Sequence, residues 1–104
     1  MTTLSTEAME QICSLANIRV KPTRKQVTFY NHKHDIQGWD VRHDGSLVGT
    51  YCVIDDVVRC IYPRGSEYTH ASLHGSNLTY EMVLRSATRT ALSELEEMMG
   101  RQPY

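Results

Sequence analysis

The chain has few of the features that identify disulfide-stabilised or zinc-binding proteins. Its 104 residues include three cysteines, and no two of them have the C-x-x-C spacing of a metal or redox site. We expect no disulfide framework and no structural zinc, and we interpret Cys13, Cys52 and Cys60 as buried, reduced thiols. A bridge between Cys52 and Cys60 would require a three-residue turn between the two strands that carry them.

Excess charge of one sign and long apolar segments are also missing. Lys and Arg total 11 against 12 for Asp and Glu, so the formal net charge of -1 gives no global attraction to nucleic acid or to an anionic membrane. No apolar run approaches the ~20 residues of a membrane helix. The first residues, MTTLSTEAMEQ, have neither the basic start nor the apolar core of a signal peptide. We expect a cytoplasmic protein with no membrane partner.

Motifs of catalysis and of nucleotide binding do not occur in the chain. It contains no GxSxG, HExxH, GxGxxG or Walker pattern, and turn chemistry accounts for the paired acids Asp55 and Asp56. His70 and His74, with Glu67 one turn earlier, have the i, i+4 spacing that can hold zinc on a helix, but they lack the HExxH pattern. We predict that the protein is not an enzyme and holds no metal and no cofactor.

Apolar residues at helical spacing predict one helix near each end of the chain. The candidate caps are Ser5 or Thr6 for the first helix and Asn77 or Thr79 for the second. The first helix ends near Asn17, and Gly100 ends the second. The apolar face of the first helix contains Met9, Ile12, Leu15 and Ala16, and that of the second contains Tyr80, Val83, Leu84, Ala87, Ala91, Leu95 and Met98.

Alternating segments between these helices predict β-strands joined by tight turns. The pair Asp44-Gly45 is typical of a two-residue hairpin turn, and Asp55-Asp56 predicts a second turn. The predicted strands run over Gln26–Tyr30, about Gln37–His43, Ser46–Ile54 and Val57–Tyr62. Pro22 interrupts the first extended segment, Asn31–Asp35 forms a turn, and residues 63–78 form a long loop.

These elements predict a single domain over residues 1–104 in the α+β class. An N-terminal helix precedes an antiparallel meander of three to four strands and a C-terminal helix, with both helices on one face of the sheet. Only one core fits a chain of this length, so the helices and the sheet must share it.

The two hairpin turns divide the strand residues between two faces of the sheet. The helices are expected to cover the face that contains Trp39, Val41, Val48, Cys52, Ile54, Val57 and Ile61, with His43, Thr50 and Arg59 toward its rim. The second, outer face contains Asp40, Arg42, Leu47, Tyr51, Val53, Val58, Cys60 and Tyr62, joined by Tyr30 if Val27 and Phe29 face inward. Because this outer face is also rich in apolar groups, we expect one of three outcomes: the loop over residues 63–78 covers it, another protein covers it, or its tyrosines are simply exposed strand residues.

We therefore expect a small protein-interaction module that acts through the outer face of its sheet. The expected contact residues are Tyr30, Asp40, Arg42, Tyr51 and Tyr62. Its role would be that of an adaptor, an inhibitor of a larger complex, or an accessory protein of a mobile element such as a phage. The partner is either a foreign protein or a second copy of the chain, which would make a homodimer.

A nucleic-acid-binding module is the alternative. Five cations in one stretch could contact phosphates, and they are Arg19, Lys21, Arg24, Lys25 and Lys33. The helix-strands-helix order, the segment GWDVRHDGSLVGTY and the helix TYEMVLRSATRTALSEL loosely resemble the double-stranded RNA-binding domain. The chain departs from that family where Thr79-Tyr80-Glu81-Met82 replaces a lysine cluster at the start of the last helix, and the family's Gly-Pro-x-His loop has no counterpart.

Overall fold

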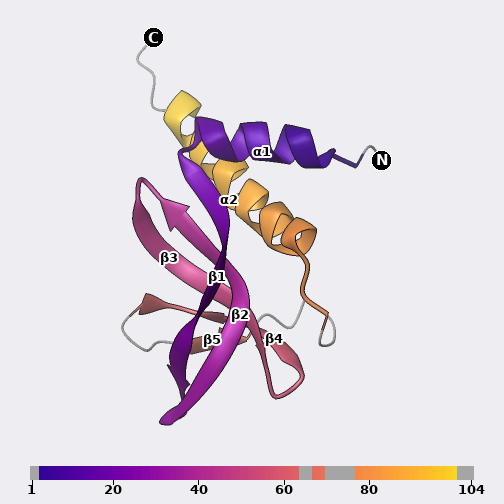
Figure 1. Cartoon of the computed structure of the whole chain (residues 1–104). Coiled ribbons are helices and arrows are strands. Elements are labelled where there is room, and N and C mark those ends of the chain that lie inside the picture. Colours follow the sequence, from indigo (N-terminus) through magenta and orange to yellow (C-terminus); the bar gives the residue numbers. More distant parts are fainter. Residues whose placement is uncertain (1–2, 64–66, 70–76, 101–104) are drawn as a thin grey trace.

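The computed structural model describes residues 3–63, 67–69 and 77–100. The elements in chain order are α1 (Thr6–Leu15), β1 (Ile18–Phe29), β2 (His32–His43), β3 (Ser46–Ile54), β4 (Val57–Ile61), β5 (Glu67–Thr69) and α2 (Tyr80–Gly100) (Figure 1). The strands form one antiparallel sheet in the order β1-β2-β3-β4-β5. The predicted α+β class, with a meander between two helices, is confirmed.

Local side-chain hydrogen bonds define where each helix begins. The Ser5 hydroxyl accepts a hydrogen bond from the Ala8 amide at 3.1 Å, and the Thr79 hydroxyl accepts one from the Met82 amide at 3.2 Å. Of the candidate caps, Ser5 and Thr79 are therefore the ones used. After α1 the chain turns at Asn17, whose φ is 57°, and its amide group donates to the Asp44 carboxylate at 2.7 Å.

Two-residue turns join the first four strands. All six turn residues have positive φ, as the type I′ hairpin requires, and the turns are Tyr30-Asn31, Asp44-Gly45 and Asp55-Asp56. The last two turns confirm the sequence prediction. Because the third turn has two residues rather than three, Cys60 lies opposite Tyr51 and not opposite Cys52. The two thiols therefore lie on opposite faces of the sheet and cannot form a bridge.

Several predicted strand limits were wrong. β1 and β2 each have 12 residues, so the predicted turn over Asn31–Asp35 is confined to Tyr30-Asn31. Pro22 does not interrupt β1, because β1 is an edge strand and its outer side needs no amide hydrogen. Within the predicted loop over residues 63–78, Glu67–Thr69 form strand β5. Residues 64–66 and 70–76 of that loop lie outside the described residues.

Both helices pack on one face of the sheet and form the larger core with it. The buried residues of this core are Met9, Cys13, Ala16, Ile18, Val41, Tyr51, Cys60, Val83, Leu84, Ala87 and Ala91. The helices also contact each other, since the Cys13 thiol lies 3.5 Å from the Thr88 hydroxyl and the Tyr80 phenol donates to the Glu10 carboxylate at 2.7 Å. Neither α1 nor α2 is long and apolar enough to cross a membrane.

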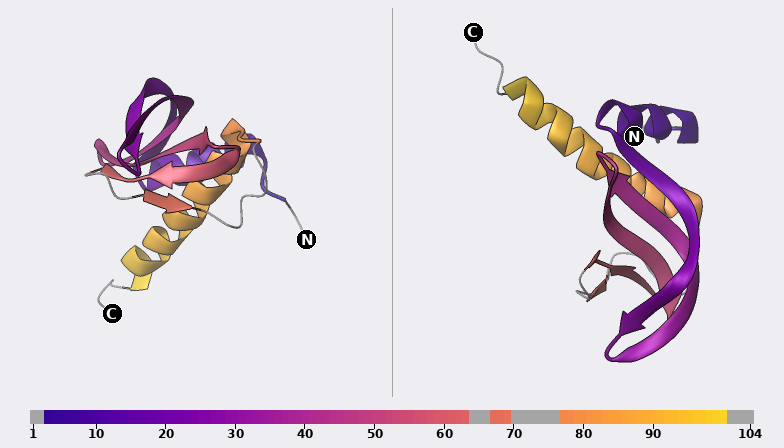
Figure 2. Two further views of the ribbon diagram at one scale, coloured as in Figure 1. Left: turned by 90° about the horizontal axis from the view of Figure 1, so that it is seen from below. Right: turned by 60° about the vertical axis from the view of Figure 1, so that its left-hand side comes forward.

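A second core lies on the opposite face, beneath the curled end of the β1–β2 hairpin. β2 pairs with β3 only from Trp39 onward, so the distal half of the hairpin is free to bend. It curls across β3 and β4 on the side away from α2 (Figure 2). Phe29 and Ile36 of the hairpin are buried there with Cys52, Ile54 and Ile61. The protein therefore covers most of its outer face with its own chain.

Gly38 stands at the bend of this hairpin. A Cβ atom built on Gly38 would overlap the carbonyl oxygen of Tyr51, so only glycine permits β2 to pass β3 at this distance. Replacing Gly38 with Ala is expected to lower the free energy of unfolding by about 1–3 kcal/mol, measured by urea denaturation. Gly100→Ala is the control, because no atom lies within 4 Å of the corresponding Cβ position. Equal stability of Gly38→Ala and the native protein would contradict the close approach.

The buried cysteines generate a second prediction. Burial raises the pKa of Cys52 and of Cys60 to about 11, and it also raises that of Cys13. Because the thiolate is the reactive form, iodoacetamide at about pH 8 is expected to leave the folded protein unmodified for hours. In denaturant all three thiols should react. Intact-mass spectrometry measures the adducts, and rapid alkylation of the native protein would show that a thiol is exposed.

Candidate protein-contact surface

A β-bulge decides which side chains of β3 face the helices. Arg42 pairs with Leu47, but Val41 pairs with Gly49, so Val48 is an extra residue in β3. Beyond the bulge every side chain of β3 lies on the face opposite to the one predicted from an uninterrupted hairpin. The prediction was correct for β2, where Trp39 and Val41 face the helices.

The predicted face was wrong for Tyr51 and Cys60, which belong to the helix-side core. Tyr51 is 8% exposed, and its phenol lies 2.9 Å from the Ser86 hydroxyl of α2. Burial raises the pKa of Tyr51, although the hydrogen bond with Ser86 acts in the opposite direction. Cys52 and Ile61, which were expected to face the helices, lie in the second core instead. Tyr51 therefore does not lie on the outer surface with Arg42.

The other two tyrosines also lie apart from Arg42. Tyr62 is half-buried and packs against the helix-side core. Tyr30 is 71% exposed at the tip of the β1–β2 hairpin, where its ring meets that of Phe29 edge-on at 4.6 Å between centroids. Arg42 is at the other end of the hairpin, roughly 35–40 Å away along β2. The structure therefore does not gather Tyr30, Tyr51 and Tyr62 into one patch.

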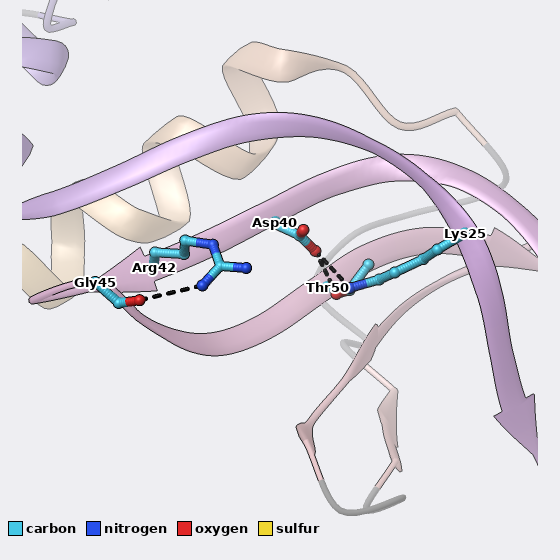
Figure 3. A network of polar contacts seen from close by, with 5 residues as sticks. All are labelled: Lys25, Asp40, Arg42, Gly45 and Thr50. Carbon is cyan, nitrogen blue, oxygen red and sulfur yellow. Dashed lines mark hydrogen bonds and ion pairs between the residues drawn. The ribbon is translucent and has the colours of Figure 1, made fainter.

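The Asp40 carboxylate of β2 connects three strands on the outer face through hydrogen bonds. Its carboxylate accepts hydrogen bonds from Thr50 of β3 at 2.6 Å and from Lys25 of β1 at 2.9 Å (Figure 3). Burial by itself would raise the pKa of Asp40, but the hydrogen bonds from Thr50 and Lys25 and the charge of Lys25 outweigh it, so the pKa is lowered. Asp40 is engaged within the fold, with a side chain only 13% exposed.

Three cations share the part of the outer face that the hairpin leaves open. Arg19 of β1 and Arg42 of β2 are direct cross-strand partners, and Lys21 lies two residues from Arg19 on the same face. All three are exposed, and the Arg42 guanidinium donates to the Gly45 carbonyl at 3.1 Å. Neither Arg19 nor Lys21 forms an ion pair with the described residues. We call Arg19, Lys21 and Arg42 the cationic cluster.

One apolar residue and two hydrogen-bonded carboxylates lie next to the cationic cluster. Leu47, the partner of Arg42 on β3, is half-buried beside the cluster. Arg19 and Lys21 also border a shallow groove along α1 with Glu10, whose carboxylate accepts the hydrogen bond from Tyr80. Asp40, opposite Lys21, is occupied by Lys25. The cluster therefore presents net positive charge to solvent.

The remaining cations predicted to bind nucleic acid do not join the cluster. Lys25 is bound to Asp40. Arg24 and Lys33 lie on the other face of the hairpin, because strand residues alternate between faces, and Arg24 donates to Gln37 at 3.3 Å. The basic stretch is therefore divided between two faces rather than gathered along one.

Among the residues that the structure describes, the groups that could support catalysis or bind metal are either buried or far from one another. The raised thiol pKa values are opposite to those of an activated cysteine nucleophile. His43 contacts Glu94 of α2 at 2.9 Å, which links the β2–β3 hairpin to the helix. No three His, Cys, Asp or Glu side chains converge as a metal site within residues 3–63, 67–69 and 77–100. His70 and His74 lie outside these ranges, so the metal prediction for them stays a prediction.

In comparisons with known proteins, no family model, curated protein sequence or solved structure matches the chain.

The hydrogen bonds to Asp40 generate a pH-dependent prediction. Asp40→Asn is expected to lower the free energy of unfolding by about 1–2 kcal/mol near pH 7, because it removes the charge that Lys25 and Thr50 contact. The lowered pKa means that the stabilisation is complete above the ordinary value of 3.8 and is lost as the pH falls through the folded-state pKa.

Urea denaturation at about pH 7 and about pH 3 measures this effect. The difference between the native protein and Asp40→Asn should shrink at the lower pH. Asp35→Asn is the control, because the Asp35 carboxylate is exposed and its contact with Gln26 spans 3.5 Å. A difference that stays constant with pH would show that the charge of Asp40 does not stabilise the fold.

Proposed function

We propose that the protein is a small, non-enzymatic interaction module that binds an acidic surface of another protein through the cationic cluster. Such a module would serve as an adaptor or as an inhibitor of a larger complex. The observation that supports this most directly is the direct opposition of Arg19 and Arg42 on the open part of the sheet. Two like charges that face each other across strands destabilise a sheet. We therefore infer that Arg19 and Arg42 contribute to binding rather than to stability.

The chemistry of the cluster indicates an anionic partner with an apolar component. Guanidinium groups bind carboxylates through two parallel hydrogen bonds, and Arg is enriched at the energetic centres of protein interfaces. Leu47 adds half-buried apolar surface beside Arg42. A carboxylate between Arg19 and Arg42 would replace their repulsion with two attractive contacts.

A protein partner is favoured over nucleic acid by the small extent of the cluster. Non-specific nucleic-acid binding depends on many phosphate contacts along an extended basic surface. Here Arg24 and Lys33 are on the other face and Lys25 is bound to Asp40. Three cations are enough to bind a local acidic patch on a protein, but they offer few contacts to a phosphate backbone.

Arg19→Glu tests the proposal with two independent readouts. The carboxylate introduced at position 19 would face Arg42 and turn the repulsive pair into an attractive one, so the free energy of unfolding should rise by about 0.2–1 kcal/mol. Binding should fall, because the cluster loses its anion-binding character. Immobilised protein is incubated with lysate of the native host, in parallel with and without nuclease treatment, and retained proteins are identified by mass spectrometry.

Arg24→Glu is the matched control, since it makes the same charge change on the opposite face of β1. Proteins captured by both the native chain and Arg24→Glu, but lost with Arg19→Glu, would support the proposal. Binding that nuclease abolishes would instead favour the nucleic-acid alternative. Capture that Arg19→Glu leaves unchanged would exclude the cationic cluster as the contact site.

A further inference from the structure

The C-terminal part of α2 extends beyond the sheet and exposes apolar side chains. α2 has 21 residues, and its buried positions end at Ala91. The C-terminal end of α2 projects away from the sheet (Figure 2), beyond the contact of Glu94 with His43. Leu92, Met98 and Met99 are 40%, 61% and 72% exposed, respectively. Large apolar groups gathered on a projecting helix are typical of a helix that packs against a partner.

The exposed flank of α2 combines these apolar groups with charges of both signs. Arg89, Leu92, Glu96 and Met99 succeed one another at spacings of three, four and three residues, so they form one stripe along the helix. All four are exposed. Neither Arg89 nor Glu96 forms a hydrogen bond or an ion pair with the described residues. Positive charge thus precedes negative charge along a stripe that has Leu92 at its centre.

The order of charges in α2 is unfavourable for an isolated helix. The last two turns carry Glu94, Glu96 and Glu97, and the last turn contains no basic residue. Carboxylates near a helix C-terminus oppose the helix dipole. Glu94 contacts the His43 ring at 2.9 Å. A cation supplied from outside the chain would compensate Glu96.

We propose that two copies of the chain associate through antiparallel packing of their α2 helices. In this arrangement a two-fold axis lies near Leu92, and Arg89 of each copy faces Glu96 of the other. Met99 of each copy covers the flank of α2 near residue 86 of its mate, so both projecting helix ends become buried. In the antiparallel arrangement each cation of the stripe faces an anion of the other copy. In a parallel arrangement like charges would face each other. The surface is distinct from the cationic cluster, so the two proposals can fail separately.

Charge reversal at the two ends of the stripe tests this dimer. Sedimentation equilibrium should give a dimer for the native chain, whereas Arg89→Glu and Glu96→Arg should each weaken self-association by about tenfold or more. In Arg89→Glu the carboxylate introduced at position 89 would face Glu96 of its mate, and in Glu96→Arg two arginines would meet. An equimolar mixture of the two variants should restore a dimer with one copy of each, because both contacts are then attractive.

Controls separate this arrangement from other modes of association. Glu7→Arg and Arg24→Glu make the same charge changes on α1 and β1, away from the stripe, and should leave the dimer intact. Circular dichroism checks that each variant keeps its helices and strands. A native chain that stays monomeric up to roughly millimolar concentration would overturn the proposal. So would a mixture of the two variants that associates no better than either variant alone.

Discussion

The close passage of β2 over β3 at Gly38 is the constraint on which the rest of the sheet depends. The Tyr51 carbonyl occupies the space of a side chain at position 38, and the pairing of β2 with β3 begins at the next residue, Trp39. The hairpin is then free to curl and to bury Phe29 and Ile36 against the outer face. Glycine at position 38 thus permits the close passage next to which the second core forms.

The curl of the hairpin is held by polar contacts as well as by apolar packing. Lys25 pairs in register with Ile36, yet its ammonium group reaches Asp40, four residues farther along β2. Thr50 approaches the same carboxylate from β3. The Arg59 guanidinium lies over the Phe29 ring, 4.4 Å from its centre, and so places a cation against the second core. These contacts bring together β1, β2, β3 and β4 around the buried part of the outer face.

Arg19 and Lys21, which are exposed on the outer face, differ from Lys25 in forming no ion pair with any residue in the described part of the chain. Arg19 and Arg42 face each other, and Lys21 lies beside them. The sheet separates this cluster from the acidic end of α2, where Glu94 contacts His43 on the helix side. A chain with a net charge of -1 therefore presents two local surfaces of opposite charge.

Local patterns in the sequence determined the order of the helices and the first four strands and two of the three hairpin turns. Helical spacing of apolar residues and the pairs Asp44-Gly45 and Asp55-Asp56 were sufficient for the α+β order, because caps and I′ turns depend on a few neighbouring residues.

The tertiary structure alone decided which residues share a face, since one extra residue at Val48 reverses the faces of β3. Gly49 was the available signal, because a glycine inside a strand often marks a bulge, but its position does not specify the register. Tyr51 thus became core, while Arg19 and Arg42, 23 residues apart in the chain, met across two strands. Such pairings are fixed by register and close approach, which no short segment of sequence contains.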